Sequence, residues 1–274
     1  MRVSEAMPEA QNDWIADLAL IGKAAREAGA VALGYFRQSP EVWWKNKDRS
    51  PVSAADFAAN ECLSGLLRAA RPGYGWLSEE TEDNADRLAC DTVFVIDPID
   101  GTRAFIAGEV TWCVSVAVVH RGRPVAGALF APALDEEYLA VEGGVALKNG
   151  AAISVTGWQP GGDIRLATAE DMLSGFSPAF RPSVTRIGHV PSLAYRLAMV
   201  AEGRIDGTLV KRNSHDWDLA AADLILERAG GGLVGLDGAA LTYNRPDVRH
   251  GVLCGASRAL IAPVLAELSP DLPG

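Results

Sequence analysis

The sequence has few cysteines and no long apolar run. Its 274 residues contain four cysteines at scattered positions: Cys62, Cys90, Cys113 and Cys254. This scatter argues against a disulfide scaffold and against zinc ligation, so we expect reduced and mostly packed thiols. The longest apolar stretches, such as Val114 to Val119, are far shorter than the roughly 20 residues of a membrane-spanning helix. We therefore expect no membrane partner.

An excess of basic residues is also missing. The chain has 35 acidic and 25 basic residues, a net charge of −10, which argues against a nucleic-acid partner or an anionic membrane surface. A chain of this charge that binds an anionic ligand must neutralise it locally, with metal or with a few placed cations. Met1 to Asp13 has neither the basic region nor the apolar region of a secretion signal, so we expect a cytoplasmic protein.

Hydrophobic patterning indicates two halves of different class. Half of the residues, 49%, are hydrophobic, which is enough for one large core or two modest ones. Spacing predicts helices at 13–35 and 53–70, then strands at 92–96, 111–119, 124–131 and 137–141. Further on, strands at 164–167 and 208–210 alternate with helices at 192–202 and 217–228. We predict an α+β half at 1–157 and an α/β half at 158–274.

The most informative motif is Asp97 to Thr102, which reads Asp-Pro-Ile-Asp-Gly-Thr directly after an apolar strand. Pro98 should stop the strand, Gly101 permits a close turn, and Thr102 could begin a helix. Carboxylate oxygens suit Mg²⁺, and a helix start attracts phosphate. The motif therefore indicates metal-assisted phosphate ester chemistry, although the same residues also form ordinary acidic turns.

Three other acidic positions lie at predicted element ends. Glu79 follows a short apolar strand, Asp56 falls at the capping-box position after Ser53, and Asp218 lies in the first turn of an apolar helix. Acidic residues are common at helix starts for dipole and capping reasons, so Asp56 or Asp218 alone would indicate little. Four such clusters in one chain favour a shared site.

These motifs resemble those of a known family. Ser78-Glu-Glu80, Asp97-Pro-Ile-Asp-Gly-Thr102 and Trp217-Asp218, with a downstream Ala229-Gly-Gly231, are similar to the inositol monophosphatase superfamily of Mg²⁺-dependent, lithium-sensitive phosphatases. Within it, the chain most resembles bacterial 3'(2'),5'-bisphosphate nucleotidases. The resemblance implies a mixed α+β and α/β fold, a five-layered αβαβα sandwich with the active site between the halves. A homodimer is common in the family.

The resemblance also implies roles for individual residues. The metal ligands would be Glu79, Asp97, Asp100, Asp218 and the carbonyl of Ile99, holding two or three Mg²⁺ ions. Asp56 and Thr102 would orient and deprotonate the attacking water, while the N–H groups of Gly101 and Thr102 would bind phosphate. Four clustered carboxylates repel one another, so cations are needed to make their ionised form tolerable.

The substrate is predicted from one departure from the family pattern. Inositol monophosphatases carry an acidic residue seven positions before the last metal ligand, where this chain has Lys211 followed by Arg212. Basic side chains suit a second phosphate, which favours 3'-phosphoadenosine 5'-phosphate, hydrolysed to AMP and phosphate. Both residues could instead be ordinary surface charges. The alternative within the class is inositol 1-phosphate or another sugar phosphate.

An alternative of another class stays open. Some relatives act through protein partners in RNA metabolism and do not depend on catalysis. The matched carboxylates and Thr102 are all present here, which favours an active enzyme.

Overall fold

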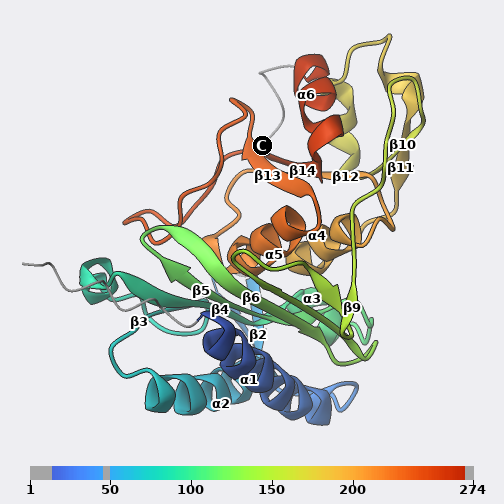
Figure 1. The fold of residues 1–274 in the computed structure, drawn as a ribbon. Helices are drawn as coiled ribbons and strands as arrows, with labels where there is room; N and C mark the ends of the chain where they lie inside the picture. The colour runs from blue at the N-terminus through green and yellow to red at the C-terminus, as the bar shows by residue number, and fades with distance from the viewer. Residues whose placement is uncertain (1–13, 46–49, 269–274) are drawn as a thin grey trace, which may run out of the picture.

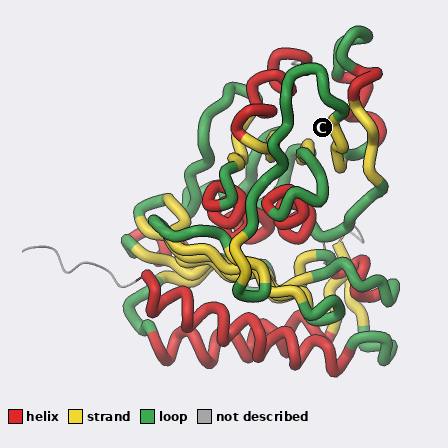
Figure 2. The backbone as a smooth tube through the Cα atoms, turned by 45° about the vertical axis from the view of Figure 1, so that its right-hand side comes forward, coloured by secondary structure: helices red, strands yellow, loops and turns green. Residues whose placement is uncertain are grey.

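The chain folds into five layers, which run from bottom to top in Figure 1. The structure, a computed structural model, describes residues 14–45 and 50–268, so the expectation about Met1 to Asp13 lies outside the described residues. Two helices, a large sheet, two helices, a smaller sheet and a last helix follow one another. The layers are equally clear in the tube view of Figure 2. The predicted αβαβα sandwich is confirmed.

The helices agree closely with the predicted ones, apart from the last, at 258–267, which was not predicted. They are α1 (Trp14–Tyr35), α2 (Ala54–Ala70), α3 (Thr102–Ile106), α4 (Leu193–Ala201), α5 (Asp216–Arg228) and α6 (Arg258–Glu267). Short 3-10 helices are η1 (Ala85–Ala89), η2 (Glu170–Gly175) and η3 (Arg181–Ser183). In the described part of the chain, no helix combines the length and apolar character needed to cross a membrane.

The larger sheet has seven strands in the order β3-β4-β5-β6-β7-β8-β9. Their bounds are β3 (Gly75–Ser78), β4 (Thr92–Asp100), β5 (Cys113–His120), β6 (Arg123–Ala131), β7 (Glu136–Val141), β8 (Leu147–Lys148) and β9 (Ala151–Ala152). All neighbours are antiparallel except β3 and β4, which run parallel. The short parallel pair carries the Ser78 and Asp97 segments to the same edge.

The smaller sheet has five strands in the order β11-β10-β12-β14-β13. Their bounds are β10 (Ile164–Ala167), β11 (Val184–Ile187), β12 (Gly207–Val210), β13 (Gly231–Gly235) and β14 (Leu253–Ser257). A separate hairpin, β1 (Val42–Lys45) and β2 (Ser50–Ser53), leads into α2. The two sheets separate between residues 152 and 164, close to the predicted boundary at 157, whose role as a domain limit stays a prediction.

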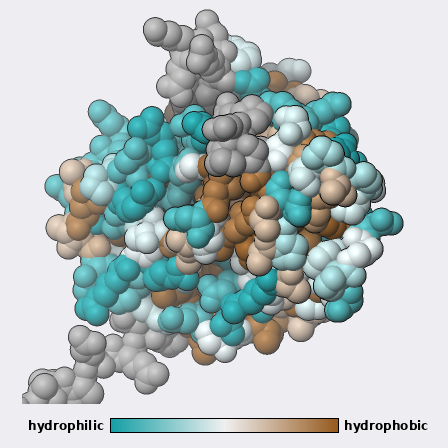
Figure 3. All heavy atoms as spheres, turned by 90° about the horizontal axis from the view of Figure 1, so that it is seen from above, coloured by the Kyte–Doolittle hydropathy of each residue, from teal (hydrophilic) through white to brown (hydrophobic). Residues whose placement is uncertain are grey.

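Alternation along β4 explains why the large sheet is covered on both faces. Phe94 and Ile96 are buried in the cluster with α1 and α2, whereas Val93 and Val95 are buried in the cluster with α4 and α5. The middle layer is therefore built from residues of the second half. Apolar residues on both faces produce the continuous apolar run seen in the sequence. On the face seen from above, many polar side chains lie around the edge and apolar ones gather toward the middle (Figure 3).

One prediction about the central motif is wrong. Pro98 does not stop the strand, because β4 continues to Asp100. The strand is instead irregular there: Asp97 pairs with Ser115 and Asp100 pairs with Cys113, so that one extra residue lies on β4. A proline, which lacks an N–H donor, is tolerated at such a bulge.

Candidate active site

A cavity of about 600 Å³ opens where the end of β4 meets the start of α5. Its lining combines most of the predicted site with residues that the sequence did not single out for it. The lining residues are Pro51, Glu79, Asp97, Ile99, Asp100, Gly101, Thr102, Arg103, Ala104, Glu109, His189, Pro191 and Asp218. Residues from both halves of the chain therefore form one site.

The bulge in β4 brings two carboxylates to the same side. In a regular strand, residues three positions apart point to opposite faces, and the extra residue between Asp97 and Asp100 cancels this alternation. Oxygen atoms of Asp97, Asp100 and Asp218 lie within 4.8 Å of one another. Such a set of hard oxygen donors fits Mg²⁺. Glu79 lines the same cavity, and its N–H donates to the Ile96 carbonyl at 3.1 Å, which fixes it beside β4.

Burial and mutual repulsion raise the proton affinity of this cluster. The pKa of Asp97 lies well above its usual value because the residue is buried and because Glu79, Asp100 and Asp218 are nearby. Burial, with repulsion from Asp218, raises the pKa of Asp100 to about 7. A divalent cation would relieve this repulsion, so the donor set fits the metal that the sequence implies.

Asp56 and Thr102 lie together, as predicted, with Asp56 behind Thr102. The Thr102 hydroxyl is 3.1 Å from Asp56 Oδ1 and 3.0 Å from the Ile99 carbonyl, so it can donate to either. The other oxygen of Asp56 accepts from the Ser53 N–H at 2.8 Å and from the Ser53 hydroxyl at 2.6 Å. Thr102 lines the cavity and Asp56 does not. Burial raises the pKa of Asp56 above its ordinary value.

The start of α4 supports Asp100, a role that the sequence did not reveal. The Ser192 hydroxyl donates to Asp100 Oδ2 at 2.5 Å, and the Ala194 N–H donates to the same oxygen at 2.6 Å. Ser192 is also the N-cap of α4, accepting from the Tyr195 N–H. A serine before an apolar helix was a visible capping signal, but nothing in the sequence showed that it faces Asp100.

The start of α5 positions Asp218. Its carboxylate accepts from the His215 N–H at 2.7 Å, and the Ser115 hydroxyl on β5 donates to the Trp217 carbonyl at 3.2 Å. Because Ser115 pairs with Asp97 in the sheet, this bond places the helix start beside the other ligands. The His215 ring stacks on Trp217 with centroids 4.6 Å apart, and His215 does not line the cavity.

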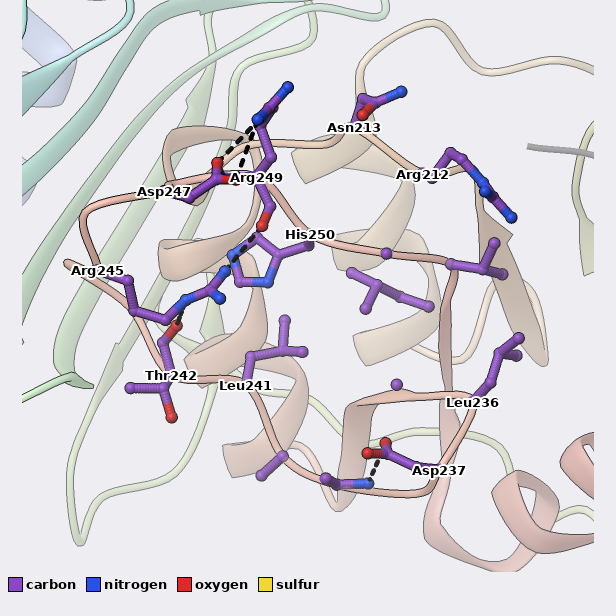
Figure 4. A pocket seen from close by; sticks show the side chains of 16 residues that line it. Arg212, Asn213, Leu236, Asp237, Leu241, Thr242, Arg245, Asp247, Arg249 and His250 are labelled. Atoms are coloured by element: carbon purple, nitrogen blue, oxygen red, sulfur yellow. Dashed lines mark hydrogen bonds and ion pairs between the residues drawn. The ribbon is translucent and has the colours of Figure 1, made fainter.

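Lys211 is not brought to this cavity. Its ammonium group pairs with Asp171, and both side chains are partly exposed. Arg212 lines a second cavity of about 870 Å³, shown in Figure 4, together with Arg245, Arg249 and His250. The role of Lys211 in substrate binding therefore stays a prediction without a contact to support it.

The fold and the acidic cavity together define a metal-dependent phosphatase. The model of the Inositol monophosphatase family matches residues 17–270, and the chain belongs to this family. It is 34% identical over 200 residues to an inositol-1-monophosphatase of Mesorhizobium japonicum, covering 68% of this chain and 73% of that one. It is 32% identical over 208 residues to a histidinol-phosphatase of Mycobacterium tuberculosis, covering 70% and 77%.

Solved structures agree with this assignment. The extragenic suppressor protein SuhB of Bartonella henselae superimposes with a TM-score of 0.79 at 27% identity, covering 93% of this chain and 99% of that one. An IMPase of Thermotoga maritima gives a TM-score of 0.80 at 25% identity, covering 92% and 96%. The predicted superfamily is confirmed, whereas a particular closeness to bisphosphate nucleotidases is not shown by these comparisons.

Proposed function

We propose that the chain hydrolyses small phosphate monoesters with Mg²⁺ held by Glu79, Asp97, Asp100, Asp218 and the Ile99 carbonyl. The observation that carries this proposal is the set of three carboxylates within 4.8 Å of one another in a cavity between the two halves. Two or three bound Mg²⁺ ions would neutralise phosphate charge, acidify a water and stabilise the leaving alkoxide. The homodimer and the cytoplasmic location predicted from the sequence remain parts of the proposal.

Thr102 and Asp56 would remove the proton of the attacking water. When the Thr102 hydroxyl donates to Asp56, its lone pairs are left to accept from a water in the cavity. A threonine hydroxyl is a weak base, so the carboxylate behind it must take the proton in the end. The raised pKa of Asp56 makes it a better proton acceptor than an exposed aspartate. Gly101 and Thr102 lie at the start of α3, where free N–H groups can bind phosphate oxygens.

For the alcohol part of the substrate we infer a small polyol or amino alcohol. The relatives named inositol-1-monophosphatase and histidinol-phosphatase support this choice. The pairing of Lys211 with Asp171 weakens the case for a second phosphate at that position.

A bisphosphate nucleotidase is the second candidate, and one observation favours it. Arg196 is half-buried and interacts electrostatically with Asp100, and its Nη1 lies 3.4 Å from the carbonyl of Val190, between the lining residues His189 and Pro191. Its Nε has no hydrogen-bond partner among the described residues. A basic group in this place could serve a second phosphate.

Phosphate release from three substrates in parallel tests both candidates. We would compare inositol 1-phosphate, histidinol phosphate and 3'-phosphoadenosine 5'-phosphate with Mg²⁺, for the native chain, Lys211→Glu and Arg196→Met. Preference for either alcohol phosphate supports the first candidate. Preference for the nucleotide, weakened in Arg196→Met, supports the second. Release from none of the three contradicts both.

A role through a protein partner, with catalysis dispensable, needs a separate test. Asp97→Asn removes one charged ligand and keeps the side-chain shape, so it should abolish hydrolysis. A biological function that survives this substitution would favour the partner role. Lithium should inhibit hydrolysis, because a monovalent ion at a metal position supplies too little charge for the transition state.

A further inference from the structure

Arg87 is a buried cation outside the cavity, and only 3% of its surface is exposed. It lies in η1, which follows the segment that carries Glu79. Its Nε and Nη2 donate to both oxygens of Asp83 at 2.7 and 2.8 Å, which closes the loop between β3 and η1. A bidentate pair of this kind fixes geometry as well as adding energy.

The same guanidinium reaches the second half of the chain. Arg87 Nη1 donates to Asn244 Oδ1 at 2.7 Å, Nη2 donates to the Arg245 carbonyl at 3.1 Å, and Asn244 Nδ2 is 3.3 Å from the Arg87 carbonyl. Three hydrogen bonds, two of them donated by the guanidinium, therefore join segments more than 150 residues apart.

Asn244 also hydrogen-bonds to the first residue of α5. Its N–H donates to Asp216 Oδ2 at 2.7 Å, and the other oxygen of Asp216 lies 2.7 Å from His250 Nε2. Asp216 is fully buried, and its two carboxylate oxygens each have a partner. It therefore acts as a fixed anchor two residues before Asp218.

Backbone bonds reinforce this anchor. The Asn213 N–H donates to the His250 carbonyl, the His250 N–H donates to the Ser214 carbonyl, and the Asp216 N–H donates to the Val248 carbonyl, at 2.8–3.0 Å. Side chains on the side of the second cavity also hold the same segment together (Figure 4). Arg245 donates to the Arg249 carbonyl, and Arg249 donates to the carboxylate of Asp247. The segment 244–250 is thus joined to both Arg87 and the helix start.

We propose that Arg87, Asn244, Asp216 and His250 are positioning residues, which hold the Glu79 segment and the Asp218 segment at the separation that metal binding requires. The inference rests on the proposed function. None of the four residues lines the catalytic cavity, so their effect reaches the metal only through the two segments. Groups that hydrogen-bond directly to metal ligands commonly change metal affinity by about 10- to 100-fold when they are removed, and these four residues, which act one step further out, should lie at the lower end of that range.

Mg²⁺ binding measured by calorimetry tests the proposal without depending on turnover. Arg87→Met, which removes every bond of the guanidinium, should weaken Mg²⁺ binding by about tenfold. Asn244→Gly is the milder variant, because Asn244 has φ +56° and glycine accepts that conformation while losing the side-chain bonds to Arg87. If Arg87→Met fails to fold, Asn244→Gly still tests the contact. The double variant should bind Mg²⁺ no more weakly than Arg87→Met alone, because both changes break the same hydrogen-bond network.

Asp206→Asn is the matched control. Asp206 is similarly buried and accepts from the Arg165 N–H at 2.7 Å and from Arg165 Nε at 3.1 Å, but it lies directly before β12 of the smaller sheet and outside the cavity lining. It should lower the melting temperature of the metal-free protein while leaving Mg²⁺ binding unchanged.

The outcomes separate the two proposals. Weaker binding in Arg87→Met and Asn244→Gly, but not in Asp206→Asn, supports the positioning role. Native-like Mg²⁺ binding in both variants, or the same loss in the control, overturns it and leaves the proposed function intact. A native chain that binds no Mg²⁺ overturns the proposed metal site and this inference with it.

Discussion

At Asp100, burial works against the charge that metal binding needs. Burial and Asp218 raise its pKa from 3.8 to about 7, so the folded protein holds a proton that the unfolded chain has lost. Such a group stabilises the folded state fully below pH 3.8, and this contribution is lost as the pH rises through about 7. The metal-free protein should therefore be less stable at pH 8 than at pH 5.

Thermal unfolding in EDTA across this pH range measures the effect. The loss should shrink in Asp100→Asn, which cannot ionise, although Asp223 adds a slope of the same sign because burial raises its pKa to about 6. Mg²⁺ should bind more weakly as the pH falls below about 7, since it competes with the proton on Asp100. A melting temperature that rises steadily from pH 5 to pH 8 would contradict the assignment.

The pair Thr102 and Asp56 should affect turnover more than metal binding. Thr102→Val removes the hydroxyl that links the cavity to Asp56, and the loss of a positioned acid or base group typically lowers turnover by about 10²- to 10⁴-fold. Thr102→Ser, which keeps the hydroxyl, is the control and should retain most activity. Steady-state rates with calorimetric Mg²⁺ titration separate the two effects; a variant that keeps full turnover would exclude the proton role.

The sequence alone predicted the cavity residues whose chemistry is local. Asp97, Asp100 and Thr102 are neighbours in the chain, and a carboxylate-rich turn after a strand is visible without a structure. The contact of Ser192 with Asp100 spans 92 residues and was not visible. The same holds for Arg87 and Asn244, since a hydrogen bond across 157 residues leaves no periodic pattern in one sequence.

At the scale of elements, helix α5 approaches the sheet unusually closely. Gly127 on β6 faces the backbone of α5, where an added Cβ would lie 2.8 Å from the carbonyl oxygen of Ala221. Gly127→Ala should therefore push the helix away, at a cost of about 1–3 kcal/mol, and weaken Mg²⁺ binding through Asp218.

Gly65→Ala in α2 is the matched control for this packing effect. An added Cβ at Gly65 would meet nothing within 4 Å, and alanine is favoured over glycine inside a helix by about 0.5–1 kcal/mol. The control should raise stability where Gly127→Ala lowers it. Denaturant unfolding of both variants measures the difference, and equal effects would argue against the close approach.

The end of β4 was predicted wrongly at the place where an irregularity in the strand shapes the candidate active site. Pro98 indicated a strand end, because proline cannot donate to a ladder, yet β4 continues past it to Asp100. The residue that breaks the rule lies within the bulge that aligns Asp97 with Asp100. The periodic spacing of apolar residues can predict only regular helices and strands. A bulge such as the one in β4, which departs from that spacing at a candidate active site, is therefore not predicted from it.

For the whole molecule, the layering could not be read from the sequence alone. The spacing of apolar residues predicted most helices and strands, but not that α5, from the second half, would cover the inner face of the first sheet. Only the family resemblance implied it. The buried cluster on that face joins Val95 and Leu129 of the sheet with Leu219 and Ile225 of α5.

This shared core predicts that the halves do not fold separately. A chain of residues 1–157 would expose the inner face of the large sheet, including Val95 and Leu129, to water. Contiguous apolar surface of this kind promotes aggregation. The fragment should therefore bind a hydrophobic dye and unfold without a cooperative transition, while co-expression with residues 158–274 should restore a compact, Mg²⁺-binding complex. If residues 1–157 alone were monomeric and unfolded cooperatively, the two halves would be independent domains, and the cavity would arise from docking rather than from one shared core.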